Sequence, residues 1–345
     1  MSFVLDIWYF AGLSSDIKIS NMMRREIAGQ PINIGRRKDG SLFALSDICP
    51  HRAAPLSAGK LTAQDTVECP YHGWTFATRS GTCQFIPALT QDQHIDTEKI
   101  KVRTFPVKET GALIWVYIGS DKNEKGEPET SPPVFQFATG KAVLDDTIAL
   151  DCHVDHGVIG LMDPAHGPYV HQQWWWRTKA SIHEKAKAFK PSPLGFTMCA
   201  HTPSSNSFAY KLLGGKPVTE IRFALPGIRT ETITVGKKTL LSFTSVTPID
   251  ENSSHIRQIF FTDILSFKIL SPLLGHFARR FLRQDAEMVA LQQQGLKYGP
   301  TLMFIEDADT QAKWYFNLKK EWALSRKQNR DFINPVKAKT LYWRS

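Results

Sequence analysis

The chain has 345 residues, 42% hydrophobic and 22% charged, which is typical of a soluble globular protein with room for two domains. Its formal net charge is +9, but the basic residues are scattered rather than clustered with aromatic residues, which argues against nucleic-acid binding. No apolar run approaches the roughly 20 residues that span a bilayer, and the N-terminus lacks the pattern of a signal peptide. We therefore expect a cytoplasmic protein with no membrane span.

The first third of the chain is rich in strand and turn signals. Residues 30–47 predict two short strands around a Lys-Asp-Gly turn, and residues 111–119 predict a buried strand bounded by glycines. The next residues are polar, rich in proline and nearly free of apolar side chains, which is typical of a linker. These patterns predict a small β domain over residues 1–120 and a linker over residues 121–133.

The pattern changes after the linker. Residues 154–176 are helical in part, with interruptions at Pro164 and Pro168, and residues 194–263 contain several strand-like segments separated by turns. Residues 271–328 have apolar positions at helical spacing. The chain is therefore predicted to be an α+β protein whose second domain, residues 134–345, combines an antiparallel sheet with helices.

The cysteines indicate metal or core roles. Their number is odd and there is no secretion signal, which argues against a disulfide framework. The five are Cys49, Cys69, Cys83, Cys152 and Cys199.

Two of these cysteines belong to a matched pair of short motifs. Cys49-Pro-His51 is followed, after 17 residues, by Cys69-Pro-Tyr-His72. Structural zinc sites usually pair cysteine with cysteine and histidine with histidine, whereas each motif here supplies one of each. That arrangement suits a [2Fe–2S] cluster of the Rieske type, with one iron on two thiolates and the other on two imidazoles. Cys83 lies outside the motifs and is interpreted as a core residue.

A second candidate metal site follows the linker. Asp163, His166 and His171 stand close together, and two histidines with one carboxylate leave positions open on an iron for O2 and substrate. On a regular helix the two histidines would lie about 140° apart, so the prolines would have to break the helix to let the rings converge. His153 and His156 are a competing pair, with Asp155 or Asp163 as their carboxylate.

Both motifs resemble those of the Rieske non-heme iron oxygenases. Residues 49–61 with 67–76 resemble the C-x-H and C-x-x-H motif, and residues 163–171 resemble the D-x2-H-x4-H motif of the group that includes dicamba monooxygenase and vanillate O-demethylase. The resemblance implies a Rieske domain followed by a helix-grip (START/Bet v 1-like) catalytic domain. This chain departs at Gly160, where those enzymes usually carry an asparagine.

The resemblance also implies a third iron ligand from a C-terminal helix. Asp285 begins a helical run, with Gln292 on the same face, whereas Glu287 points about 200° away from Asp285. We therefore favour Asp285. The carboxylates that remain as alternatives are Asp263, Glu306, Asp307 and Asp309.

The function that the resemblance implies is that of a terminal oxygenase in aromatic compound catabolism. It would use O2, a [2Fe–2S] cluster and a mononuclear Fe(II), with electrons from NAD(P)H through a separate reductase, with or without a ferredoxin. In a homotrimer, Asp163 would link His72 of one subunit to His166 of the next. The chain has no NAD or flavin fingerprint, which fits an external reductase. Asp163 could instead be a helix N-cap before Pro164.

The substrate class stays open among an O- or N-methylated aromatic ring, an aromatic ring that is hydroxylated and a large ring system such as a tetrapyrrole. The candidate lining residues are apolar: Phe196, Met198, Phe223, Leu225, Phe243 and Phe260. The run Trp174–Trp176 could belong to the pocket or to a trimer interface. Two functions compete with the oxygenase: a Rieske electron-transfer protein without mononuclear iron, and a zinc-stabilised binding protein.

Overall fold

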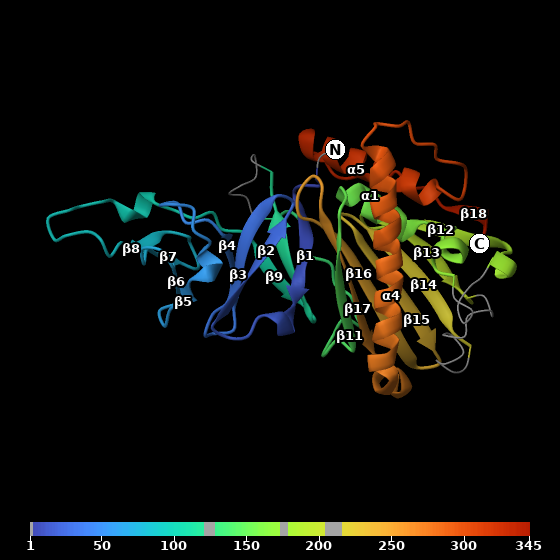
Figure 1. Ribbon diagram of the computed structural model, residues 1–345, viewed down its shortest axis with the longest axis horizontal. Coiled ribbons are helices and arrows are strands. Elements are labelled where there is room, and N and C mark those ends of the chain that lie inside the picture. The colour runs from blue at the N-terminus through green and yellow to red at the C-terminus, as the bar shows by residue number, and fades with distance from the viewer. Residues whose placement is uncertain (1–2, 121–127, 173–178, 204–215) are drawn as a thin grey trace. The chain divides into compact units, whose positions relative to one another are not determined.

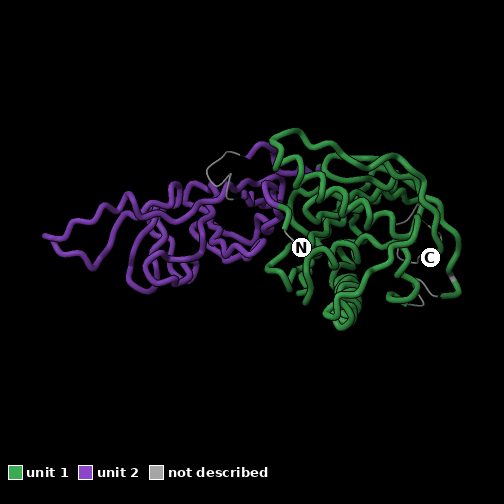
Figure 2. The backbone as a smooth tube through the Cα atoms, turned by 90° about the horizontal axis from the view of Figure 1, so that it is seen from above, with its two compact units in different colours: residues 1–4, 136–345 green, residues 5–135 purple. Residues whose placement is uncertain are grey.

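The computed structural model describes residues 3–120, 128–172, 179–203 and 216–345. The chain divides into two compact units, one formed by residues 5–135 and the other by residues 1–4 and 136–345 (Figure 2). Residues 121–127 of the expected linker and the run Trp174–Trp176 lie outside the described residues. None of the helices that the structure describes is long and apolar enough to cross a bilayer.

The unit of residues 5–135 is built from three small antiparallel sheets, ordered β1-β10-β9, β2-β3-β4 and β5-β6-β7-β8. Every residue of β1 and β10 is buried, so this pair of strands belongs to the core of the unit, with β10 as the central strand of its sheet. The strands are β1 (Ile7–Leu13), β2 (Asn21–Ile27), β3 (Gln30–Arg36), β4 (Leu42–Ser46), β5 (Lys60–Leu61), β6 (Thr66–Glu68), β7 (Thr75–Ala77), β8 (Cys83–Phe85), β9 (Val107–Thr110) and β10 (Leu113–Ile118). Short 3-10 turns are η1 (Ser14–Asp16), η2 (Leu56–Ala58) and η3 (Thr97–Lys99).

The larger unit is an eight-stranded antiparallel sheet with the order β11-β17-β16-β15-β14-β13-β12-β18. Its strands are β11 (Leu144–Leu150), β12 (Glu184–Ser192), β13 (Gly195–His201), β14 (Val218–Ala224), β15 (Ile228–Val235), β16 (Lys238–Pro248), β17 (Ser254–Thr262) and β18 (Lys339–Arg344). Its helical elements are α1 (Val154–Met162), α2 (Gly167–Val170), η5 (Lys179–Ser181), α4 (Leu265–Leu296) and α5 (Thr310–Lys327). The α+β class expected for the chain is therefore confirmed.

Helix α4 lies across the strands at one end of this sheet (Figure 1). It packs on β11, where Nε of Arg279 donates a hydrogen bond to Oδ1 of Asp146 at 2.7 Å. The strand register aligns Met198, Ile221 and Glu231 in one row, so these side chains point from the same face of the sheet. That face carries the helices and, as shown below, a cavity beside the candidate iron ligands.

Helix α5 covers an aromatic cluster on the same face. Phe196 lies 5.3 Å from Phe223 between ring centroids, and Phe223 contacts Tyr315 of α5 edge-on at 5.8 Å. All three side chains are buried. Phe196 and Phe223 therefore belong to the core between sheet and helix, because their positions along the strands place them under α5, and neither lines the cavity beside the histidines.

We expect Phe223→Ala to destabilise this unit by about 3–5 kcal/mol, because it removes a buried ring and leaves a cavity between β14 and α5. Urea unfolding followed by circular dichroism measures the loss. Val218→Ala, at an exposed position on the same strand, is the matched control and should change stability by less than about 1 kcal/mol. Equal stability of the two variants would contradict the packing described here.

Candidate metal centres

The first candidate centre is formed by two loops of the same conformation, one after β4 and one between β6 and β7. In each loop the cysteine amide donates to the carbonyl five residues on, at 2.9 Å for Cys49 and 2.8 Å for Cys69. The amide four residues on donates back to the cysteine carbonyl, from Ala53 at 2.8 Å and from Gly73 at 3.1 Å. Both of these residues have positive φ, 58° and 70°, which closes the turn tightly. The two motifs are thus a matched pair in structure as well as in sequence.

The cysteines of these loops point inward and the histidines lie nearer the surface. Cys49 and Cys69 are each 2% exposed and belong to one core cluster. The rings of His51 and His72 lie 4.5 Å apart between centroids, and Trp74 stacks on His51 at 4.7 Å with an interplanar angle of 7°. Two buried sulfurs and two outer imidazoles are the arrangement that a Rieske cluster requires.

The protonation states in these loops also fit metal binding. Burial, and then the adjacent Cys69, raises the pKa of Cys49 to about 11, so a thiolate there needs a cation to stabilise it. Partial desolvation, followed by the neighbouring His51 and Arg52, lowers the pKa of His72 and favours the neutral imidazole that binds metals. Cys83 is buried in the same core cluster, as expected for a packing residue.

The second candidate centre depends on a break between two short helices. Helix α1 ends at Met162, directly before the Asp163-Pro164 pair, and α2 begins after His166 with a proline in its first turn. The prolines therefore interrupt the helix as expected, and His166 and His171 flank α2 at its two ends.

This break lets the two histidines meet a carboxylate from α4. Nε2 of His166 lies 3.1 Å from Nε2 of His171, and Oδ1 of Asp285 lies 3.5 and 3.1 Å from those nitrogens. These three are the one group of three possible metal ligands that the described part of the chain brings within 4.8 Å of one another. Ligand atoms about 2.1 Å from a metal and at right angles lie about 3 Å apart, so the spacing fits one ion.

A hydrogen bond and an ion-pair contact behind the histidines orient the rings for metal binding. Nδ1 of His171 lies 3.1 Å from Oε1 of Gln284, and Nδ1 of His166 lies 3.5 Å from Oδ2 of Asp163. A hydrogen-bond acceptor beside Nδ1 keeps the ring proton on Nδ1, so Nε2 has the free lone pair that binds a metal. Two such lone pairs facing a carboxylate repel one another unless a cation lies between them, so the donor set fits a divalent metal.

Asp163 is tied to this centre but is not an N-cap of α2, whose N-cap is His166. Its Oδ1 accepts from the amide of Ala165 at 2.7 Å, and its side chain is 36% exposed. Burial would raise the pKa of Asp163, but the contact with His166 outweighs it and lowers the pKa, so the carboxylate stays ionised.

The competing residues are engaged elsewhere. Asp155 accepts hydrogen bonds from the hydroxyl of Tyr315 at 2.6 Å and the ammonium of Lys319 at 2.5 Å, inside the core rather than at a metal site. His153 stacks on Phe3 at 5.9 Å. The other carboxylates considered bind the backbone amide of Thr239 (Asp263), Lys313 (Glu306), Lys339 (Asp307) and the amide of Ile305 (Asp309).

Gly160, where this chain departs from the enzymes it resembles, faces open space. A Cβ added at Gly160 would meet nothing within 4 Å. A cavity of about 120 Å³ lies there, lined by Gly160, Asp163, Asp285 and Gln292 of α4 among others. Gln292 of α4 therefore lines the space beside Gly160.

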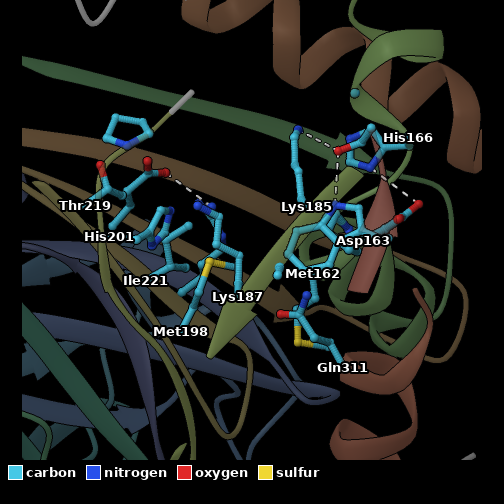
Figure 3. Close-up of a pocket in the computed structure, with 18 of the residues that line it drawn as sticks. Met162, Asp163, His166, Lys185, Lys187, Met198, His201, Thr219, Ile221 and Gln311 are labelled. Carbon is cyan, nitrogen blue, oxygen red and sulfur yellow. Dashed lines mark hydrogen bonds and ion pairs between the residues drawn. The ribbon is translucent and has the colours of Figure 1, made fainter. Parts of the chain in front are cut away.

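A larger cavity, of about 460 Å³, opens beside the two histidines (Figure 3). Of the six apolar residues expected to line it, only Met198 does so. The rest of this wall is more polar than expected, with His201, Lys187 and the Arg229–Glu231 pair. Lys185 and Lys187, alternate residues of β12, were a sequence signal for this polar face, because alternate residues of a strand share a face.

Comparison with known proteins identifies one domain of the chain and shows which solved structures share its fold. Residues 7–106 match the model of the Rieske [2Fe-2S] domain. Over 320 residues the chain is 26% identical to the chloroplastic chlorophyllide a oxygenase of Arabidopsis thaliana, covering 86% of this chain and 53% of that protein. It is 34% identical over 179 residues to the oxygenase component of dicamba O-demethylase from Stenotrophomonas maltophilia, covering 50% and 49%.

The chain thus spans about half the length of the curated relatives it matches. Among solved structures, apo dicamba monooxygenase is similar with a TM-score of 0.74 and 22% identity, covering 95% of this chain and all of that one. NdmA of Pseudomonas putida CBB5 with caffeine is similar with a TM-score of 0.73 and 18% identity, covering 93% and 91%. Matched loops, domain and fold agree: the chain carries a Rieske [2Fe-2S] domain and has the fold of dicamba monooxygenase, a Rieske oxygenase.

Proposed function

We propose that the chain is the terminal oxygenase of a multicomponent Rieske system that hydroxylates or oxidatively demethylates a ring compound. The observation that carries the proposal is the meeting of His166, His171 and Asp285 beside a cavity of about 460 Å³, in a chain that also has the Cys2His2 loops. An electron-transfer protein needs the loops alone. A second donor set with open positions next to a ligand-sized cavity supports an oxygenase.

The proposed cofactors are a [2Fe–2S] cluster on Cys49, Cys69, His51 and His72, and an Fe(II) on the second donor set. When bound, they would supply single-electron transfer and O2 activation, respectively. The electrons come from NAD(P)H through a separate reductase, with or without a ferredoxin. We further propose a cytoplasmic homotrimer, as the resemblance to the Rieske oxygenases implies.

The contribution of the protein's own residues lies in orientation and proton placement. Gln284 and Asp163 hold a proton on Nδ1 of His171 and His166, which keeps both Nε2 atoms free to bind metal. Asp285, on the long helix α4, adds the negative charge that makes the site selective for a divalent cation. The cavity beside them would hold the substrate next to these ligands.

Asp163 has a further proposed role, as the link between His166 of one subunit and His72 of the next. We expect Asp163→Asn to retain both metal centres but to lower the rate of electron transfer to the mononuclear site by at least about 100-fold, because the ionised bridge is lost. Stopped-flow absorption of the pre-reduced protein, mixed with O2 and substrate, measures how fast the cluster is reoxidised. Wild-type reoxidation rates in the variant would remove Asp163 from the pathway.

The experiment that tests the proposal is O2 uptake by the purified protein with a surrogate reductase and NADH, across methoxylated, N-methylated and unsubstituted aromatic compounds. The expected result is uptake that depends on one class of compound, together with three iron atoms per chain. Two iron atoms per chain and no substrate-dependent uptake would favour the electron-transfer function, and a colourless protein containing zinc would overturn both.

A further inference from the structure

Lys187, a cation in the large cavity, forms no ion pair with any residue that the structure describes. Lys187 of β12 lies two residues before Phe189, which pairs with Met198, so Lys187 and Met198 point from the same face of the sheet. Both line the cavity that also contains His166 and His171 (Figure 3). Within the described ranges, the half-buried ammonium of Lys187 makes no ion pair.

The electrostatic surroundings of Lys187 agree with this. Burial lowers its pKa, and no carboxylate among the described residues opposes the effect. A partly desolvated ammonium without a partner is unfavourable, and a ligand that supplies negative charge relieves this cost. A lysine that only covered apolar surface would extend its ammonium into water instead.

Other charged or basic side chains of the cavity have described partners, and Glu184, which also lines it, is exposed to solvent. Arg229 pairs with Glu231 at 3.2 Å, so these two charges cancel. The ammonium of Lys185 donates to Oγ of Ser345 at 2.7 Å. Nδ1 of His201 lies 3.0 Å from the carbonyl of Cys199, and burial lowers the pKa of this histidine, so it is neutral.

We propose that Lys187 binds an anionic group of the substrate, a carboxylate or a similar oxyanion, at the wall of the cavity formed by β12 to β15. The inference rests on the proposed function in one respect: this cavity is taken as the substrate site. The proposed substrate is therefore amphipathic, with a ring and an anionic group, rather than purely apolar. The ring would lie against Met198 and Ile221, and the anion would fix its orientation relative to His166 and His171.

The test is a set of binding measurements on the metal-loaded protein. Isothermal titration calorimetry compares benzoate, benzenesulfonate and phenyl phosphate with the neutral benzamide, and inorganic phosphate tests whether an anion without a ring suffices. We expect at least one aromatic anion to bind about 10- to 100-fold more tightly than benzamide, the range for a charge-assisted hydrogen bond. Phosphate should bind more weakly than phenyl phosphate, because it lacks the ring that packs on the apolar wall.

Three variants test whether the preference for aromatic anions depends on the side chain of Lys187. Lys187→Met should abolish it while leaving benzamide binding within about twofold, and Lys187→Arg should retain most of it because the charge is kept. Lys190→Met is the matched control, since Lys190 is exposed on the opposite face of the same strand, and it should bind like the wild type. No preference for any aromatic anion in the wild type, or a preference that survives in Lys187→Met, overturns the proposal.

The outcome is separable from that of the proposed function. Binding is measured without O2 or reductase, so a charge preference that depends on Lys187 would stand even if no compound supported O2 uptake. Conversely, O2 uptake with neutral aromatic compounds and no charge preference in binding would leave the oxygenase in place and remove the anion site.

Discussion

Asp285→Asn should remove the mononuclear iron and leave the Rieske cluster intact. The change keeps the shape of the side chain but removes the negative charge that lies 3.1 Å from Nε2 of His171. Loss of a group that merely supports a ligand weakens metal binding by about 10- to 100-fold, and loss of the ligand itself should exceed about 100-fold. Iron analysis should fall from three atoms per chain to two, with unchanged visible absorption and no substrate-dependent O2 uptake.

The matched control for this variant is Glu287→Gln on the same helix. Glu287 is exposed, carries the same charge and stands only two residues away, so the change tests the general effect of removing an acid from α4. We expect three iron atoms per chain in this control. Three iron atoms in Asp285→Asn as well would mean that Asp285 does not bind the metal.

Cys69→Ser should abolish the cluster and destabilise the unit of residues 5–135. Cys69 lies in the core cluster of this small unit with 2% exposure, and a serine oxygen is a far poorer iron ligand than a thiolate. Because the four ligands come from two separate loops, cluster binding also contributes to the folding free energy. Visible absorption and electron paramagnetic resonance of the reduced protein should lose the cluster signal, and thermal unfolding should begin at lower temperature.

Cys83→Ser separates loss of the cluster from a general effect of cysteine replacement. Cys83 is buried in the same core cluster but lies outside both loops. This variant should lose some stability, because a hydroxyl is placed in an apolar site, and should keep the full cluster spectrum. Retention of the spectrum by Cys69→Ser, or its loss in Cys83→Ser, would contradict the ligand assignment.

Most of the predictions made from the sequence rested on short local motifs. The two loops at Cys49 and Cys69 are short, and their turns depend on residues within five positions of each cysteine. His166 and His171 are likewise brought together by prolines that lie between or beside them. Interactions of this range are encoded in neighbouring residues, so a single sequence suffices to predict them.

The third ligand and the nature of the cavity depended on packing. Asp285 competed with Asp263, Glu306, Asp307 and Asp309, and only the path of α4 over β11 brings one of them to the histidines. Gln284 supports His171 across 113 residues of sequence, a separation at which no local pattern is informative. The strand signals gave the alternation of side chains, but only the position of α5 decides that Phe223 is core.

The sequence by itself therefore determined the α+β layout, the matched Cys-His loops and the broken helix that carries two histidines, because each rests on contacts within a few residues. The tertiary structure alone decided which carboxylate joins those histidines and that Lys187 faces the same cavity without a described counter-charge. Those features arise where elements far apart in the chain pack together, and the faces they turn to one another follow from the whole fold.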